Sequence, residues 1–257
     1  MPTIQQLFDL TGRVAIVTGG SRGLGQEFAE GLAEVGAKLM LCARRDEWLT
    51  PTVNELRGRG FAVEAMLCDV ANPTHVQAVV DKAVAAYGQV DILVNNAGVT
   101  WGENPETMAV DKWQRVIDTN LTGAFLFAQA AGRKMLERKA GSIINIASVA
   151  GFRSHVDGPH FAGYAASKAG LMGLTRDLAA TWGRQGVRVN AIAPGYFHSR
   201  LADPAIALVE PRIQATTPIP RVGAPGELKG ACVYLASDAS SYVTGQVIIV
   251  DGGGTIA

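Results

Sequence analysis

The sequence has no excess of charge of either sign, since its 257 residues contain 23 Lys and Arg against 23 Asp and Glu. Electrostatic binding to nucleic acid relies on clustered basic residues that release counterions, and this chain has no basic run. We therefore expect no nucleic-acid partner. Charged residues make up only 18% of the chain, against roughly 25% in soluble domains generally, so a large part of the protein is expected to be buried.

Cysteine is scarce, and the three cysteines (Cys42, Cys68 and Cys232) form no CxxC pair. This excludes a disulfide framework and favours a reducing, cytoplasmic setting. There is no apolar run of about 18 residues and no signal-peptide pattern in residues 1–10, so we expect no membrane partner. The four histidines form no HxxxH or HExxH pattern, so no metal is expected.

Glycine and apolar residues are abundant, with 30 glycines and 48% hydrophobic residues. Short β-rich runs alternate with longer stretches of helical period. This alternation requires right-handed crossovers between parallel strands, so it predicts an α/β fold: a Rossmann-type, doubly wound, parallel seven-stranded sheet with helices on both faces. The expected strands are 13–18, 38–42, 62–67, 92–94, 142–146, 187–191 and 247–250, and the expected helices include 26–35, 73–87, 110–138, 164–184 and 227–236.

No linker, repeat or low-complexity tract interrupts this pattern. We therefore expect residues 1–257 to form a single dinucleotide-binding catalytic domain. The segment at about 197–225 contains five prolines and no strand, so it is expected to be a helix-containing lobe that covers the substrate.

A glycine-rich turn, Thr18–Gly25 (TGGSRGLG), follows the first strand and opens the first helix. Glycines here let the backbone approach a pyrophosphate, whose charge then faces the free N–H groups of the helix N-terminus. An ordinary tight turn is the alternative, but the strand–turn–helix context favours a dinucleotide cofactor. The expected contacts in this turn are Gly19, Ser21, Arg22, Gly23, Leu24 and Gly25.

The residues after the second strand favour NADP over NAD. An acidic residue at this point would bind the ribose 2′-hydroxyl of NAD, but Cys42–Ala43 holds no carboxylate. Arg44 and Arg45 follow, and together with Arg22 they offer guanidinium groups suited to a 2′-phosphate. Two alternatives stay open: the arginines form a solvated loop, or Asp46 allows NAD.

The end of the third strand adds Asp69 and Val70 to the expected cofactor contacts. Asp69 is placed to accept a hydrogen bond from the adenine amino group. It equally fits the N-cap of the helix that begins near Pro73.

Tyr164 and Lys168 are four residues apart in an expected helix and therefore lie on one face. A free tyrosine has a pKa of about 10, and a neighbouring ammonium stabilises the phenolate, so we expect a lowered pKa for Tyr164. This spacing is common by chance, but Ser148 follows a strand at the carboxyl edge of the sheet, where ligands bind. The three residues predict acid/base chemistry on a carbonyl or alcohol.

These motifs, in this order, resemble the single-domain short-chain dehydrogenase/reductase family over essentially the whole chain. The resemblance rests on TGGSRGLG, Asn95–Gly98, Asn120, Ser148, YAASK, Pro194–Gly195 and the closing VTGQVIIVDGG. It implies hydride transfer between a nicotinamide ring and a carbon bearing oxygen. Tyr164 would be the general acid/base, Lys168 would lower its pKa and hold the nicotinamide ribose, Ser148 would bind the substrate oxygen, and Asn120 would hold a relay water.

The resemblance also implies further cofactor contacts and an assembly. Asn96, Ala97 and Gly98 would line the adenosine ribose, and Pro194, Gly195, Phe197 and Ser199 would orient the carboxamide. A homotetramer, or a homodimer, would form through residues 110–138 and 164–184. The interval from Ser148 to Tyr164 is 16 positions against the family's usual 13, so the loop beside the substrate pocket departs from its relatives.

The expected function is reduction of a ketone or a 3-oxoacyl thioester with NADP, NAD being possible. A sugar-acid dehydrogenase resembling gluconate 5-dehydrogenase is one alternative. The other is a non-catalytic nucleotide-binding sensor on the same fold. Competent residues at Asn120, Ser148, Tyr164 and Lys168 favour the enzyme.

Overall fold

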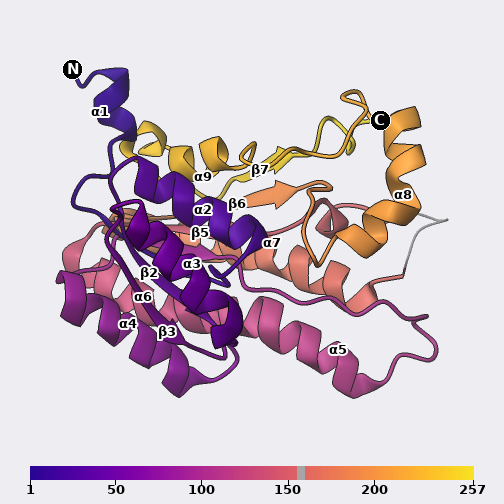
Figure 1. The fold of residues 1–257 in the computed structure, drawn as a ribbon, viewed down its shortest axis with the longest axis horizontal. Coiled ribbons are helices and arrows are strands. Elements are labelled where there is room, and N and C mark those ends of the chain that lie inside the picture. Colours follow the sequence, from indigo (N-terminus) through magenta and orange to yellow (C-terminus); the bar gives the residue numbers. More distant parts are fainter. Residues whose placement is uncertain (155–159) are drawn as a thin grey trace.

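A computed structural model describes residues 1–154 and 160–257 of the chain. Its centre is a seven-stranded parallel sheet with the strand order β3-β2-β1-β4-β5-β6-β7 (Figure 1). The predicted doubly wound α/β fold is therefore confirmed. The strands are β1 (Val14–Thr18), β2 (Lys38–Ala43), β3 (Val63–Leu67), β4 (Ile92–Asn95), β5 (Gly141–Ile146), β6 (Val187–Pro194) and β7 (Val247–Val250).

Helices connect the strands and cover both faces of the sheet. They are α1 (Ile4–Phe8), α2 (Gly23–Glu34), α3 (Asp46–Gly58), α4 (Pro73–Tyr87), α5 (Val110–Ile117), α6 (Gly123–Arg138), α7 (Ala162–Trp182), α8 (Asp203–Thr216) and α9 (Lys229–Ala236). Of the helices in the described residues, none is both long and apolar enough to cross a membrane.

Alternate residues of each strand enter two separate cores. In β1, Ala15 and Val17 pack with α2, α3 and α9, whereas Ile16 packs with α4, α6 and α7 on the opposite face. In β2, Leu41 lies in the same core as Ala15 and Val17, and Met40 lies in the same core as Ile16. Both sets are fully buried, which explains why the strands appear in the sequence as continuous apolar runs.

All strands are parallel, but the order in which they are added to the sheet reverses between β1 and β4. The chain winds outward from β1 through β2 to β3, then returns to pair β4 with β1 and continues through β5 and β6 to β7. Such a reversal leaves a crevice at the carboxyl ends of the strands, where ligands of open α/β sheets bind. The glycine turn after β1 and the loop after β4 meet at this crevice.

The helix predicted at 110–138 is present but contains an irregular turn. A π-helical turn, Asp118–Thr122, separates α5 from α6. A π-helical turn adds one residue to a helical repeat. None of the residues Asp118–Thr122 is a glycine or proline, so the sequence of the turn itself does not indicate an irregular helix. Asn120 lies within this turn. The expected 197–225 lobe contains α8, which stands near the C-terminus in Figure 1.

Candidate active site

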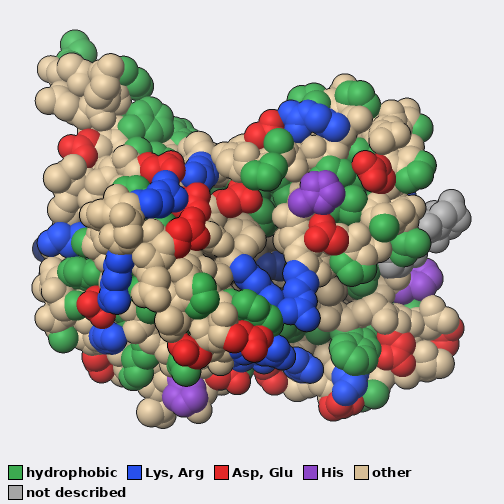
Figure 2. Space-filling model, in the orientation of Figure 1, with side chains coloured by type: hydrophobic (Ala, Val, Ile, Leu, Met, Phe, Trp, Pro, Cys, Tyr) green, Lys and Arg blue, Asp and Glu red, His purple; other side chains and the backbone are tan. Residues whose placement is uncertain are grey.

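A cavity of about 830 Å³ opens at the carboxyl ends of the strands. In Figure 2 a hollow in the middle of the face is bordered by Lys and Arg side chains. All but two of the site residues predicted from the sequence line this cavity. Those that do are Gly19, Ser21, Arg22, Gly23, Leu24, Gly25, Arg44, Arg45, Val70, Asn96, Ala97, Gly98, Ser148, Tyr164, Lys168, Pro194, Gly195, Phe197 and Ser199.

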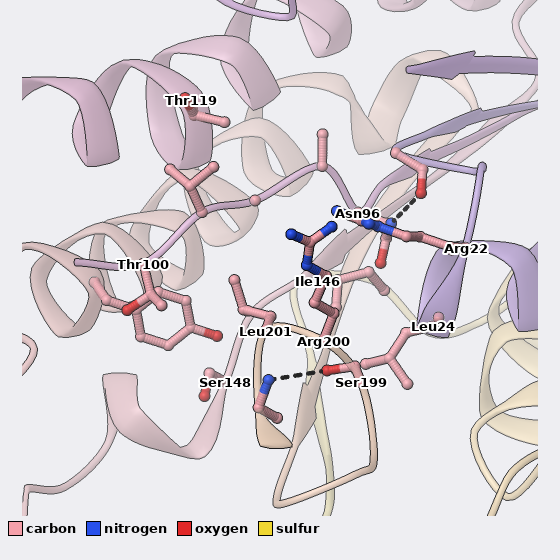
Figure 3. Close-up of a pocket in the computed structure, with 18 of the residues that line it drawn as sticks. Arg22, Leu24, Asn96, Thr100, Thr119, Ile146, Ser148, Ser199, Arg200 and Leu201 are labelled. Carbon is pink, nitrogen blue, oxygen red and sulfur yellow. Dashed lines mark hydrogen bonds between the residues drawn. The ribbon is translucent and has the colours of Figure 1, made fainter. Parts of the chain in front are cut away.

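The glycine turn is held against the end of β4 by a small hydrogen-bond network. Asn96 Nδ2 donates to the carbonyl oxygens of Thr18 at 3.0 Å and Gly19 at 3.2 Å. Thr18 Oγ1 accepts from the backbone N–H groups of Asn96 and Ala97, each at 3.0 Å. Figure 3 shows Asn96 within the cavity lining. A Cβ atom at Gly25 would overlap Gly19 O and Asn96 Nδ2. Only glycine fits there, and Gly23 and Leu24, at the start of α2, line the cavity.

Ser148, Tyr164 and Lys168 come together on the wall formed by β5 and α7. Ser148 lies two residues beyond the end of β5, and Tyr164 and Lys168 lie one turn apart on α7. Lys168 Nζ donates to Ile146 O at 2.6 Å and lies 5.5 Å from the centre of the Tyr164 ring. Ser148 lies close enough to the Tyr164 hydroxyl to lower the pKa of that phenol. A serine hydroxyl, a phenol and a buried amine thus converge on one point of the cavity.

Asn120 is 1% exposed and does not line the cavity. Its Oδ1 accepts from Val99 N at 2.8 Å, and its Nδ2 donates to Val99 O at 2.9 Å and Ser167 Oγ at 3.0 Å. The π-helical turn therefore directs this side chain to the loop after β4 and joins that loop to α7. Asn120 positions the cavity wall on the side of Tyr164 and Lys168.

Residues 19–255 match a family model described as enoyl-(acyl carrier protein) reductase. A solved structure of a short-chain type dehydrogenase/reductase from Mycobacterium marinum superimposes with a TM-score of 0.95 and 37% identity, covering 99% of this chain and 100% of that one. The chain belongs to the short-chain dehydrogenase/reductase family. It is an oxidoreductase of the type that interconverts alcohol and carbonyl groups.

Two further relatives indicate what members of this family bind. The 3-oxoacyl-[acyl-carrier-protein] reductase of Synechocystis is 40% identical over 246 residues, which cover 95% of this chain and 97% of that protein. A gluconate 5-dehydrogenase from Burkholderia cenocepacia, solved in complex with NADP and tartrate, is 39% identical with a TM-score of 0.94 and covers 99% of this chain and 100% of that one. The family resemblance stated from the motifs is confirmed, and NADP occupies a close structural relative of this short-chain dehydrogenase/reductase.

The expected lowering of the Tyr164 pKa is wrong for this structure. Burial raises the pKa of Tyr164, and the hydrogen bond with Ser148 offsets only part of that effect. Burial also lowers the pKa of Lys168 to about 8, so the amine loses its charge more readily than an exposed lysine. The neutral phenol is the stable form, and it is a proton donor.

The buried amine gives a first testable prediction, on stability. Because the pKa of Lys168 falls from 10.5 to about 8 on folding, the unfolded chain binds more protons between these values, and stability rises with pH there. Relative to Lys168→Met, wild type should gain up to about 3 kcal/mol in free energy of unfolding across this window. Urea titrations of both proteins at several pH values measure the difference. Parallel pH profiles would contradict it.

The two functions considered for Asp69 have different outcomes. The N-cap of α4 is Asn72, whose Oδ1 accepts from Thr74 N and His75 N, so the capping alternative is wrong. Asp69 Oδ1 instead accepts from Ala71 N at 3.1 Å within its own loop. The neighbouring Val70 lines the cavity whereas Asp69 does not, so contact between Asp69 and adenine remains a prediction.

Several residues that line the cavity were not predicted from the sequence. They lie on α3, on the loop after β4, on α5, in the π-helical turn, and just before α8, and include Trp48, Thr100, Lys112, Arg115, Thr119, Arg200, Leu201 and Ala202. No local pattern marks them, because they reach the cavity only through the packing of distant segments. Trp101 also lines the cavity, and its Nε1 donates to Glu103 Oε2 at 2.7 Å.

The lengthened loop between Ser148 and Tyr164 is described only in part. Its residues 155–159, which include His155, Asp157, Gly158 and Pro159, lie outside the described residues. Phe161 packs against Gly102, where an added Cβ would lie 2.8 Å from its ring. The end of the loop therefore supports the segment that carries Trp101.

Proposed function

We propose that this short-chain dehydrogenase/reductase reduces a ketone to a secondary alcohol with NADPH, using Tyr164 as the proton donor. The observation that carries the proposal is the convergence of Ser148, Tyr164 and Lys168 in the same cavity as the glycine turn. The raised pKa of Tyr164 keeps its proton at neutral pH. A resting proton donor suits carbonyl reduction, in which the developing alkoxide must be protonated.

Some residues of the chain orient the substrate, and others transfer or stabilise the proton. When bound, the nicotinamide cofactor supplies the hydride. The Ser148 hydroxyl holds the carbonyl oxygen beside the Tyr164 hydroxyl, which donates its proton to that oxygen. Lys168 Nζ lies beside Gly98, since a Cβ there would be 3.8 Å away, and it favours the phenolate that forms after proton transfer whenever the amine is charged. Asn120 fixes the opposing loop through Val99.

The cavity also fits NADP in particular. Gly19 and Gly25 let the glycine turn pack closely against the Asn96–Ala97 segment, because a Cβ at either would contact or overlap it. Glycines in such a turn also let the backbone approach a pyrophosphate. Arg22, Arg44 and Arg45 line the end of the cavity beside β2. Asp46, the reason to keep NAD open, accepts a hydrogen bond from Thr50 Oγ1 at 2.7 Å inside α3. Three guanidinium groups line this end of the cavity and the Asp46 carboxylate is bonded within α3, so the site favours the 2′-phosphate of NADP over the 2′-hydroxyl of NAD.

The walls beside the catalytic groups favour a ketone with an apolar body. Val99, Trp101 and Leu201 line this part of the cavity, and a 3-oxoacyl thioester would extend along them. A sugar acid is the second candidate. It is favoured by Lys112 and Arg115, which line the same cavity and could pair with a carboxylate.

Steady-state reduction of a panel of ketones, 3-oxoacyl thioesters and 5-ketogluconate with NADPH or NADH tests the proposal. We expect kcat/KM to be at least about tenfold higher with NADPH, since one charge-assisted hydrogen bond is worth that much. The kcat/KM for apolar ketones should exceed that for the sugar acid. A preference for NADH would overturn the cofactor assignment. Tight NADPH binding without turnover of any substrate would identify a sensor instead.

We infer further that the enzyme is a cytoplasmic homotetramer or homodimer. Val110 and Trp113 on α5 and Phe125 on α6 are large apolar side chains with exposed fractions of 77%, 37% and 41%. Such a group on one helical layer is typical of an interface between copies of a chain. Light scattering at micromolar concentration should give the mass of an oligomer, and a stable monomer would contradict it.

A further inference from the structure

Three arginines from different parts of the chain gather around one indole ring. The guanidinium carbon of Arg22 lies 3.5 Å from the centre of the Trp48 ring, that of Arg45 lies 5.0 Å away, and that of Arg200 lies 5.2 Å away. Arg22 belongs to the glycine turn and Arg45 precedes α3, whereas Arg200 comes from the segment before α8. Figure 3 shows Arg22 and Arg200 approaching each other inside the cavity.

This group carries more positive charge than its surroundings neutralise. Of the acidic side chains in the described residues, Glu47 pairs with Arg45 at 3.4 Å, and no ion pair is formed by Arg22 or Arg200. Burial and the charges of Arg200 and Arg45 lower the pKa of Arg22. Cations held this close favour a multiply charged anion between them, and stacking on indole leaves their N–H edges free to bind it.

The segment that carries Arg200 is braced so that this side chain points into the cavity. Ser199 Oγ accepts from Ala202 N at 3.1 Å, and Asp203 Oδ1 accepts from Ser199 N at 3.2 Å. The next residues, Leu201 and Ala202, line the cavity on the same side. Arg200 is thus attached to the lobe that covers the substrate, yet it reaches across to α3.

We propose that Arg200 is an additional guanidinium ligand of the cofactor's 2′-phosphate, supplied by the substrate lobe, so that NADP also fixes residues 198–202 over the cavity. This deepens the proposed function and rests on its choice of NADP. The 2′-phosphate is favoured over the pyrophosphate as the partner, because Trp48 lies on the β2 side with Arg45. The pyrophosphate instead faces the backbone N–H groups that open α2.

Titration with cofactor fragments tests the assignment through binding alone, so the test does not require catalytic activity. The probes are 2′,5′-ADP, which carries the 2′-phosphate, and 5′-ADP, which carries the pyrophosphate alone. The variants are Arg200→Gln and, as a control on the same lobe, Arg212→Gln, which does not line this cavity. Arg200→Gln should weaken the binding of 2′,5′-ADP by about tenfold or more and leave the affinity for 5′-ADP unchanged. Arg212→Gln should change neither.

The outcomes separate the two proposals. If wild type binds both fragments equally, the choice of NADP fails, and this inference falls with it. If wild type prefers 2′,5′-ADP and Arg200→Gln keeps the full preference, Arg200 is not a ligand, while the choice of NADP stands. If Arg200→Gln weakens the binding of 5′-ADP as much as that of 2′,5′-ADP, or more, Arg200 contacts a part of the cofactor other than the 2′-phosphate, and the assignment is overturned.

Hydrogen exchange tests the link to the substrate lobe. In wild type, 2′,5′-ADP should slow amide exchange across residues 199–206 relative to 5′-ADP, because the phosphate holds Arg200. In Arg200→Gln this difference should vanish. Equal exchange with the two fragments in wild type would overturn the link even if Arg200 contributes to affinity.

Discussion

Replacement of Tyr164 by phenylalanine is expected to lower kcat for carbonyl reduction by roughly 100- to 10,000-fold, the usual contribution of a positioned general acid. The ring stays in place on α7, so the wall of the cavity is preserved and only the proton donor is lost. Ser148 keeps its place after β5 and accepts from Ala150 N at 3.2 Å. NADP affinity should therefore change by less than about twofold, because the phenol oxygen contributes chemistry more than binding.

Initial rates of NADPH oxidation, together with NADP titrations, measure both effects. Tyr234→Phe is the matched control, since Tyr234 lies on α9 away from the cavity and contacts Phe8 with ring centres 6.5 Å apart. It should keep wild-type turnover. Full activity in Tyr164→Phe would contradict the assignment of the proton donor.

Gly25→Ala is expected to weaken cofactor binding strongly. The added methyl group would overlap the carbonyl of Gly19 and the amide of Asn96. Neither can move freely, because Asn96 Nδ2 already bonds Thr18 O and Gly19 O. The turn must shift, and the N–H groups that face the pyrophosphate shift with it. We expect NADP affinity to fall by more than about tenfold and stability to fall by about 1–3 kcal/mol.

Gly173→Ala provides the control for this prediction. Gly173 lies on α7, and a Cβ there would meet no atom within 4 Å. Alanine should therefore leave NADP affinity unchanged and raise stability by up to about 1 kcal/mol through helix propensity. Urea unfolding and NADP titration give both quantities. Wild-type affinity in Gly25→Ala would show that the turn does not hold the cofactor.

The fold was largely predictable from the sequence, because the central strands β1, β2, β4, β5 and β6 are largely buried on both faces and so appear as mainly apolar runs. Val14–Thr18 and Lys38–Ala43 are examples, each followed by a glycine or a polar loop. The π-helical turn at Asn120 was not predictable in this way. It stems from the hydrogen bonds that Asn120 makes with Val99 and Ser167, which are far from it in sequence.

The site was predictable where local motifs define it and not where distant segments meet. The glycine turn and the Tyr164–Lys168 pair follow from spacing. Trp48 and Arg200 are 152 positions apart, and no spacing rule joins them. The direction of the Tyr164 pKa was missed for a related reason: desolvation depends on what surrounds the phenol in three dimensions, whereas the sequence shows only the nearby Lys168.

The central claim is that a hydride passes from NADPH to a carbonyl carbon held at Ser148 and Tyr164. The most direct measurement uses NADPH deuterated at C4 of the nicotinamide, on one face or the other, with a ketone that the enzyme reduces. We predict that one of the two labelled cofactors delivers deuterium to the carbinol carbon of the product, and that Tyr164→Phe forms almost no product. Product that carries no deuterium from either labelled cofactor would contradict the account.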